Sequence, residues 1–550
     1  MEPKIKKINS PDKNETEVLV VGAGPTGLMM ACQLAIHNIR FRIIDKTEDH
    51  TTQSRAMVLQ ARSLEIFDQM GIAQRAIEIG QIADGFGAFF HSKSPVKISL
   101  RGISESSTHF PFLLMLEQAK TEKLLSDFLM SQGHFVERKS TFISFEENEQ
   151  GIISIIKNTD GIEEKIYTKY IIGCDGTHSQ VREQMNLPFI GSTYPQSLFV
   201  LDCKLDITLP ENEFYFSFNG KYITGLFPLK EGRYRILGTV PDELEGSDTI
   251  TFNDIKKGFE KRVPVDISLR DPEWISMYHA HHQYAPAFKK GNCFIAGDAA
   301  HIHSPIGGQG MNTGLQDAYN LAWKLSLVIK GKAPELLLNT YTEERLVVAK
   351  KIVRTTDTIF YFVSRQKIRK YITPVLWFVF SQLMSKRQFF RKFIFRTVSE
   401  IGIQYRKSPL SQNASFGDFD SDAPKPGDRL PFLIYKNKNG EKLNIQDRVK
   451  GKTFHLFIFS KDNLFSDIGF LTKEYEDILT AETIPFSNET EIIFKTLSIA
   501  NNGYYLIRPD LYIAYRSSKN DYKQLKKYLS RFLITGKTVN IQRQLSLQFT

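Results

Sequence analysis

The stretch GNCFIAGDAAHIHSPIGGQGMNTGLQDAYNLAWKL, residues 291–325, decides how the rest of the chain is arranged. Its apolar run at 293–296 predicts a buried strand, and Asp298 follows where an α/β sheet places ligand contacts. The glycine-rich turn 305–310 comes next, and apolar residues at helical spacing predict a helix from about Met311. A carboxylate and a helix N-terminus together suit a ligand that carries hydroxyl groups and negative charge. On these residues alone, an ordinary strand-turn-helix connection stays open.

A second motif lies far upstream and supplies the other half of the prediction. EVLVV at 17–21 predicts a buried parallel strand, and GAGPTG at 22–27 leads into a predicted helix. In this GxGxxG pattern Gly22 allows the tight turn, Gly24 lets a pyrophosphate approach the backbone, and Gly27 lets helix and strand pack closely. The βαβ context therefore predicts a Rossmann-like dinucleotide fold, against the alternative of a glycine turn without a ligand.

Asp45 indicates which dinucleotide this fold holds. It ends the predicted strand 41–44 and stands 18 positions after Gly27. A carboxylate there accepts hydrogen bonds from ribose hydroxyls and repels a 2′-phosphate. The predicted ligand is an ADP moiety without a 2′-phosphate, as in FAD or NAD.

The segments that follow add helices, a meander and a second acid motif. Residues 50–70 predict a helix capped by Ser54. This helix contains Arg55 and Arg62, which are expected to be solvated surface charges, with the alternative that one of them bridges a pyrophosphate. Gln118 lies in a predicted helix, and alternating runs between 141 and 170 predict an antiparallel β-meander. YIIGCDG at 170–176 then repeats the pattern of a buried strand that ends at an acid, Asp175.

From about 189 to 282 the pattern changes to antiparallel strands rich in aromatics. Phe214, Phe216 and Phe218 share one face of a strand and Tyr215 takes the other. Core packing is the favoured role for most of these rings. A sheet inserted into a nucleotide fold also makes an apolar wall for a ligand.

Bulk properties fit a soluble multidomain protein in a reducing compartment. The 550 residues are 41% hydrophobic and 24% charged, with net charge +10. The four cysteines lack a CxxC pair or metal-ligand spacing, so disulfide scaffolds and structural zinc find no support. The N-terminal residues lack the apolar core of a signal peptide, and the apolar run at 374–383 is too short to span a bilayer. These features predict a cytoplasmic protein without nucleic-acid partners.

The C-terminal third contains long helices, a linker and a small α/β unit. Residues 364–407 mix basic and aromatic side chains, which favours a charged outer face of packed helices over a membrane or acidic partner. A polar linker rich in Pro, Gly and Asp begins near 408. TFHLFIF at 453–459 and the strand-turn-strand pattern at 504–515 predict a separate domain beyond it.

Taken together, the motifs resemble those of the flavoprotein aromatic hydroxylases, the single-component FAD monooxygenases. VLVVGAGPTGL is similar to their nucleotide fingerprint, YIIGCDGTHSQVR to their DG motif, and FIAGDAAHIHSPIGGQGMNTGLQDAYNLAWKL to their GD motif. The order agrees over roughly residues 15–410. The tail resembles the thioredoxin-like C-terminal domain of the phenol hydroxylase branch, which includes hydroxylases of polyketides and antibiotics; without CxxC, a thiol redox role is not supported.

This resemblance implies an α/β fold of three parts. An FAD-binding domain with connecting helices takes residues 15–188 and 283–410, an inserted β-sheet substrate domain takes 189–282, and a thioredoxin-like domain takes 425–550. Expected cofactor contacts fall in three stretches and at five single residues. The stretches are Gly22, Ala23, Gly24, Pro25, Thr26 and Gly27; Asp45 and Lys46; and Gly308, Gly310, Met311 and Asn312. The single residues are Arg55, Gln118, Asp175, Asp298 and Pro305.

The implied activity is hydroxylation of an aromatic substrate with NADPH or NADH and molecular oxygen, through a flavin hydroperoxide. The general base stays unassigned: Tyr215, Tyr222, His279, His281 and His282 are candidates by location only. Expected partners are a small aromatic substrate and oxygen, in a monomer or homodimer. Alternatives are an FAD-dependent dehydrogenase or halogenase (the latter without its tryptophan-rich signature), a membrane-associated quinone-ring hydroxylase, and a non-catalytic flavin-binding protein.

Overall fold

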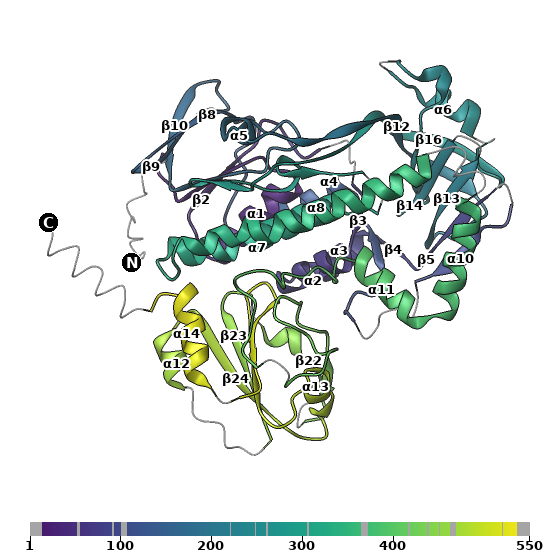
Figure 1. Ribbon diagram of the computed structural model, residues 1–550. Coiled ribbons are helices and arrows are strands. Elements are labelled where there is room, and N and C mark those ends of the chain that lie inside the picture. Colours follow the sequence, from purple (N-terminus) through teal and green to yellow (C-terminus); the bar gives the residue numbers. More distant parts are fainter. Residues whose placement is uncertain are drawn as a thin grey trace, which may run out of the picture.

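The computed structural model describes residues 14–51, 56–90, 93–100, 107–219, 222–247, 249–259, 262–304, 307–364, 372–415, 418–436, 439–449, 451–461, 469–519 and 521–535. Figure 1 shows a nucleotide-binding part, a large twisted sheet beside it and a C-terminal unit. The long helix α7 (Gly310–Ile329) runs between the nucleotide-binding part and the C-terminal unit. No helix in these ranges combines the length and apolarity needed to cross a bilayer.

A five-stranded sheet with the order β17-β18-β11-β1-β2 forms the centre of the nucleotide-binding part. Its strands are β1 (Val18–Val21), β2 (Phe41–Ile44), β11 (Tyr170–Gly173), β17 (Lys289–Lys290) and β18 (Cys293–Ile295). All except β17 run parallel. Strands β1, β11 and β18 are buried along their length, which is why they read as continuous apolar runs. The α/β prediction is confirmed.

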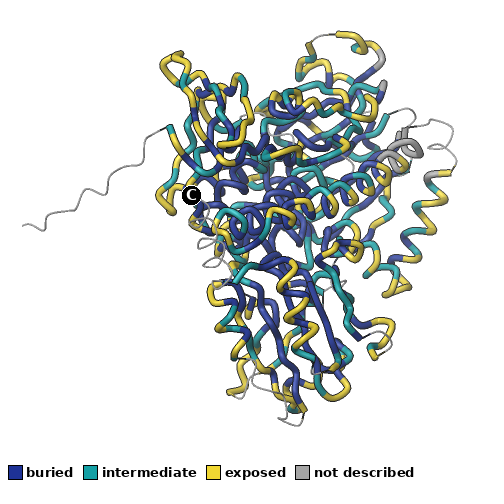
Figure 2. The backbone as a smooth tube through the Cα atoms, turned by 60° about the vertical axis from the view of Figure 1, so that its left-hand side comes forward, coloured by how far each residue is buried: buried dark blue, intermediate teal, exposed yellow. Residues whose placement is uncertain are grey.

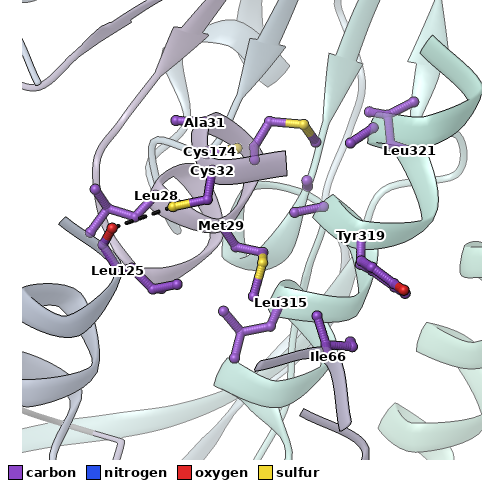
Figure 3. Packing of buried hydrophobic residues seen from close by; sticks show 14 of the residues in the cluster. Leu28, Met29, Ala31, Cys32, Ile66, Leu125, Cys174, Leu315, Tyr319 and Leu321 are labelled. Carbon is purple, nitrogen blue, oxygen red and sulfur yellow. Dashed lines mark hydrogen bonds between the residues drawn. The ribbon is translucent and has the colours of Figure 1, made fainter. Parts of the chain in front are cut away.

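Helix α1 (Pro25–Ile36) packs between α4 (Gln118–Ser131) and α7, as Figure 3 shows. Leu28 and Met29 belong to the same buried cluster as Leu315 of α7. The Cys32 thiol donates to the carbonyl oxygen of Leu125 at 3.3 Å, which joins α1 to α4. All four cysteines are free and buried. Helix α7 is therefore fixed against the first βαβ unit by apolar packing.

Two small sheets flank this core. The predicted meander is present as β8 (Thr141–Asn148), β9 (Gly151–Lys157) and β10 (Glu163–Thr168), all antiparallel. A second sheet joins β3 (Val58–Leu59), β7 (Leu113–Met115) and β4 (Gln81–Ala83), next to helices α2 (Ala61–Gln69) and α3 (Ala73–Ile79). Helix α2 begins at Ala61, whereas the sequence predicts a start near Ser54; that residue lies outside the described ranges.

The aromatic-rich region forms an eight-stranded sheet with the order β19-β16-β12-β15-β14-β13-β5-β6. Its strands are β5 (Gly85–Phe89), β6 (Val96–Ser99), β12 (Ile190–Ile207), β13 (Glu213–Asn219), β14 (Tyr222–Pro228), β15 (Arg233–Thr239), β16 (Ile267–Tyr284) and β19 (His301–Ile302). Strands β5, β6 and β19 lie outside the range 189–282, and β5 pairs with β13 in parallel. Short α6 (Phe252–Phe259) covers one end.

Long helices follow α7. Helix α8 (Leu336–Ser364) crosses the molecule, and α10 (Thr373–Lys386) and α11 (Gln388–Val398) lie beside the edge strands of the large sheet (Figure 1). The sequence pattern at 374–396 predicts one helix, whereas the structure has two, which meet at Arg387 in extended backbone (φ −119°, ψ 96°).

The C-terminal unit is built on a sheet with the order β20-β26-β25-β23-β24. Strands β23 (Phe454–Ser460) and β24 (Leu479–Pro485) are parallel, whereas β25 (Gly503–Ile507) and β26 (Ile513–Ser517) continue antiparallel. Helices α12 (Gly469–Glu474), α13 (Glu491–Thr496) and α14 (Tyr522–Phe532) complete a β-α-β-α-β-β-α order. This order agrees with a thioredoxin-like unit, which stays a prediction, as do the domain boundaries.

Candidate cofactor site

Each parallel strand of the central sheet ends at a segment that the sequence singles out. Asp45 follows β2, the turn at 22–24 follows β1, Asp175 follows β11 and Asp298 follows β18. Cys174 N donates to Val21 O at 2.7 Å, and Ala296 N donates to Gly173 O at 3.0 Å. Strands β1, β11 and β18 therefore end at the same level of the sheet. Because parallel strands bring their carboxyl ends to one edge, the segments that begin at Gly22, Asp45, Asp175 and Asp298 lie at the same edge of the sheet.

The glycines after β1 have different surroundings. Gly22 has φ +100°, and a Cβ there would clash with the carbonyl oxygen of Cys174. At Gly27 a Cβ would clash with the carbonyl oxygen of Gly22, because α1 packs directly on the turn. At Gly24, by contrast, a Cβ would meet no atom within 4 Å among the described residues. The middle glycine thus borders open space, as a pyrophosphate cradle requires.

The first turn of α1 leaves its N–H groups available. Gly24 is the N-cap, no side chain caps the helix, and Pro25 occupies the first turn. Asp45 lies across the turn and is held by three donors: Ala23 N at 2.6 Å, and Thr47 N and Oγ1 at 2.8 and 2.6 Å. Neighbouring Lys46 is exposed. The helix dipole and the fixed carboxylate make a polar cradle at this edge.

Thr26 is the point at which the two distant halves of the site meet. A Cβ at Gly297 or at Gly314 would in each case clash with Thr26 Oγ1. Gly297 belongs to the turn η2 (Gly297–Ala299), and Gly314 lies in the first turns of α7. The α1 N-terminus, the acid turn and the α7 N-terminus are therefore in direct contact.

Asp298 projects from otherwise buried surroundings. Its flanking residues Gly297 and Ala299 are buried, whereas Asp298 itself is exposed. The turn is held by Asp317 of α7, which accepts from Gly297 N at 3.0 Å, His301 Nε2 at 2.7 Å and Arg345 Nε at 2.6 Å. Burial would raise the pKa of Asp317, but Arg345 and His301 outweigh it and lower that pKa. A fully buried charged network thus positions Asp298.

Helix α7 begins next to this turn with its N–H groups uncapped by a side chain. Asn312 is fully buried, and its carbonyl accepts from Gln60 N at 2.9 Å and Ser63 Oγ at 2.7 Å. Its amide donates to Val58 O and Gly308 O, both at 2.8 Å. The Asn312 side chain therefore ties α7 to β3 and α2. Pro305 lies outside the described residues.

Asp175 has one buried oxygen, Oδ1, without a hydrogen-bond partner in the described part of the chain. Its other oxygen accepts from Val181 N at 3.3 Å, and burial raises the pKa of the carboxyl. Arg182 donates to Thr177 O at 3.0 Å and Ala299 O at 3.2 Å, so the DG turn is tied to η2. An orphaned buried acceptor at this edge of the sheet is consistent with a ligand group there.

Two further predictions concern Gln118 and the arginines. Gln118 begins α4 and contacts the edge of the site, with Oε1 accepting from Ala56 N at 3.4 Å. Arg55 lies outside the described residues. Arg62 differs from both predicted roles: it is buried, pairs with Glu65 at 3.1 Å and donates to Asp510 O at 2.7 Å. It joins α2 to the C-terminal unit, a partner 448 residues away that no local pattern reveals.

His303 is a site residue that the motif analysis does not select. Its Nδ1 lies 3.0 Å from Ser304 O, which can only accept, so Nδ1 carries the proton. Its Nε2 is buried without a partner among the described residues, and a Cβ on Gly310 would lie 3.7 Å from it. Burial lowers the pKa of His303 to about 4, which keeps the ring neutral near pH 7. The signal available in the sequence is its position two residues after His301 in the GD motif.

Four of the five candidates for a general base contact neighbouring side chains of the protein. Tyr215 donates to Glu213, and burial with that carboxylate raises the pKa of the phenol. His281 pairs with Thr193 at 2.8 Å and His282 with Ser192 at 2.9 Å across β12 and β16. His279 is exposed, and the guanidinium of Arg262 lies 4.0 Å from the centre of the Tyr222 ring.

The strand β19 connects the acid turn to the aromatic sheet. It pairs with the end of β16, with Ile302 opposite Gln283 and His301 opposite Tyr284. An open glycine cradle, a carboxylate for a ribose, a second carboxylate at a helix N-terminus and an adjoining aromatic sheet fit a bound FAD. This fold and site define the class of FAD-dependent aromatic hydroxylases.

Comparisons with known proteins give the family. The chain belongs to the FAD binding domain family, whose model matches residues 15–356. It is 29% identical to 6-methylpretetramide 4-monooxygenase of Streptomyces rimosus over 93% of this chain and 92% of that one. It is 30% identical to pentachlorophenol 4-monooxygenase of Sphingobium chlorophenolicum over 77% of each chain. The structure of aklavinone-11 hydroxylase with FAD and aklavinone has the same fold, with TM-score 0.78 and 22% identity over 95% of this chain and 99% of that one. The chain is an FAD-dependent monooxygenase, and NAD(P)H is the reductant typical of the family.

Proposed function

We propose that this enzyme hydroxylates a fused-ring polyketide or phenolic substrate that lies against the aromatic face of the large sheet. The observation that carries this proposal is a continuous set of rings on that face. Phe214 stacks on Phe86 and on Phe227, with centroids 5.3 and 5.6 Å apart, and meets Phe216 edge to face at 5.8 Å. Offset and edge contacts of this kind suit a flat aromatic ligand.

The substrate class draws further support from the relatives, whose names give a pretetramide and a chlorinated phenol. Both are monooxygenases, which favours hydroxylation over the dehydrogenase and non-catalytic alternatives. The same names favour a polyketide or phenolic ring over a quinone ring.

The cofactor contacts are part of the proposal. The first motif, residues 22–27, holds the pyrophosphate, while Asp45 and Lys46 lie at the adenosine ribose. Gln118 and Asp175 are assigned to the phosphates and ribityl chain; Arg55, outside the described residues, is assigned to the same contacts by the family resemblance alone. Asp298 accepts from the ribityl hydroxyls. The last group is assigned to the pyrimidine edge of the ring: Gly308, Gly310, Met311 and Asn312. Pro305, outside the described residues, joins this group by the family resemblance alone.

When bound, FAD supplies the redox chemistry, taking electrons from NAD(P)H and activating oxygen. The protein's own part is positioning and charge. The uncapped N-terminus of α7 favours negative charge at its end by about 0.3–2 kcal/mol. His303, kept neutral by burial, offers Nε2 as an acceptor next to Gly310. The apolar rings of the sheet exclude water from the side where the substrate lies.

The proposal includes a cytoplasmic location, a monomer or homodimer, and a thioredoxin-like C-terminal unit without a thiol role. The cysteines support the last point, since all four lie outside that unit.

The test is a screen of purified, FAD-loaded protein for aromatic compounds that accelerate NADPH or NADH oxidation. The expected result is a product heavier by one oxygen atom, labelled when the reaction runs under oxygen-18 gas. A product that lost two hydrogens and gained no label would show a dehydrogenase instead. Substrate binding without any stimulated oxidation would point to a non-catalytic flavin protein.

A further inference from the structure

Helix α10 presents an apolar stripe to solvent. Ile372, just before the helix, and Val375, Leu376, Val379 and Leu383 are exposed and recur at helical spacing, so they share one face. Val375 is 61% exposed and Leu376 is 54% exposed. The sequence predicts a charged outer face here; the structure places apolar residues on it instead.

The opposite face of α10 explains this orientation. Trp377 packs edge-on against Phe86 at 5.8 Å and lies 6.3 Å from Phe218, and its indole N–H donates to Val96 O at 3.4 Å. Met384 on the same face is buried. Since Trp377 and Met384 pack inward, the aliphatic residues on the opposite side of the helix point outward, and Phe378 is exposed beside them. Figure 2 shows exposed segments on the outer side of the molecule where this helix lies.

Helix α11 extends the apolar surface. Phe389 is 85% exposed and Phe393, one turn later, is 58% exposed. Phe390 instead packs edge-on against Phe380 at 5.6 Å, so the two helices form one body. Two packed helices that both expose large apolar side chains are typical of an interaction site.

The charged side chains of these two helices have one sign. Residues 373–398 contain five Lys or Arg and no Asp or Glu. Within α10 and α11 the basic side chains are Lys386, Arg387, Arg391, Lys392 and Arg396. In a two-fold contact with a second copy of this chain, each patch would face another patch of the same positive charge. An anionic lipid surface instead meets both features, since it takes apolar side chains below its headgroups and attracts basic ones.

We propose that the outer faces of α10 and α11 dock this enzyme on an anionic lipid bilayer as a peripheral surface. The apolar stripe and the two exposed phenylalanines enter the headgroup boundary, and the basic residues face the anionic headgroups. The inner face of the same helix, through Trp377, contacts the rings of Phe86 and Phe218. Docking would therefore bring the aromatic sheet close to a phase in which apolar aromatic compounds concentrate.

The test is flotation of the FAD-loaded protein with phosphatidylcholine vesicles, with and without phosphatidylglycerol. The expected result is flotation with the anionic vesicles, weakened by salt because surface charges are screened. Phe389→Ser combined with Phe393→Ser should lower the partition coefficient about tenfold or more. Arg387→Gln should lower it about fivefold on anionic vesicles. Phe135→Ser is the matched control, since Phe135 is 69% exposed and lies outside the surface.

Turnover of a water-soluble aromatic substrate should not change in the phenylalanine variant, which separates docking from catalysis. Protein that stays unbound with anionic vesicles at low salt would overturn the proposal, as would equal losses in Phe135→Ser. A wild-type dimer in sedimentation that becomes a monomer in the phenylalanine variant would assign the surface to a second copy instead.

Discussion

Gly24 and Gly27 stand three residues apart in one motif and meet different surroundings. At Gly27 a Cβ would clash with backbone, whereas at Gly24 it would meet no described atom within 4 Å. Gly24 also has φ −71°, which alanine adopts without strain.

Gly24→Ala should therefore leave the stability of the apoprotein close to wild type and weaken FAD binding at least tenfold, because the added methyl group occupies the pyrophosphate's space. Gly27→Ala should lower the free energy of unfolding by about 1–3 kcal/mol through overpacking. Thermal unfolding of both apoproteins and FAD titration by fluorescence quenching would measure the difference. Equal FAD affinity in Gly24→Ala and wild type would remove Gly24 from the site.

Asp298 is the second residue for which the geometry allows a sharp expectation. Asp317 accepts from Gly297 N and so holds the turn, and Asp298 itself is exposed, so Asp298→Ala should fold normally. Loss of charge-assisted hydrogen bonds to a ribityl chain, at about 1.5–3 kcal/mol, should weaken FAD binding about tenfold to a hundredfold and abolish NAD(P)H consumption. Asp127→Ala, on the exposed side of α4, is the control. A variant that keeps full yellow FAD and full turnover would contradict the assignment.

At the scale of elements, α7 depends on a carboxyl group that follows α11. Glu400 is buried and accepts from Thr313 Oγ1 at 3.2 Å and from Gln316 Nε2. Burial raises the pKa of Glu400 to about 8, so the folded protein keeps this proton where an unfolded chain would release it.

Because the folded pKa lies above the unfolded value near 4.5, the contribution of Glu400 to stability is full below about pH 4.5 and falls as the pH rises toward 8. Glu400→Gln should therefore gain melting temperature relative to wild type between pH 5 and 8. Thermal unfolding of both proteins across that range measures the gap. A gap that stays constant with pH would show that Glu400 titrates normally.

The elements that the sequence predicts best are those determined by short local sequence patterns. Continuous apolar runs identify β1, β11 and β18, and glycine turns after them identify the site edge. Contacts between distant segments were not predictable. Arg62 is buried at its contact with Asp510, which lies far away in the sequence. Strand β5 pairs with β13, which is also distant in sequence. The outward face of α10 is determined by the packing of Trp377 against Phe86. The motifs did not identify His303, because its ring comes to lie against Gly310 only in the folded chain.

At the scale of the whole molecule, a buried ionic network joins the C-terminal unit to the helices of the cofactor site. Arg508 donates to Glu344 of α8 at 2.6 and 2.9 Å and to Asp510 at 2.6 and 2.9 Å. Lys324 of α7 also contacts Glu344, at 2.8 Å, and burial lowers the pKa of Lys324 to about 8.

Arg508→Met should lower the free energy of unfolding by about 3–5 kcal/mol, since it leaves two carboxylates buried with too few partners. Arg406→Met breaks a half-exposed pair with Asp428 and should cost less than about 1 kcal/mol. Denaturant unfolding followed by circular dichroism would compare them. Similar losses for the two variants would mean that the network does not hold the C-terminal unit in place.

The contact of Thr26 with Gly297 and Gly314 has a consequence for biosynthesis. Ribosomes add about 5–20 residues per second, so roughly 15–60 s separate the synthesis of the glycine turn after β1 from that of the α7 segment that closes on it. The first βαβ unit lacks its sheet neighbour β11 for about half of this interval, and it lacks β18 and the helix that covers α1 until near its end. The nascent chain therefore exposes the apolar face of α1 for most of its translation, and it acquires a complete flavin site only after more than half of the protein has left the ribosome.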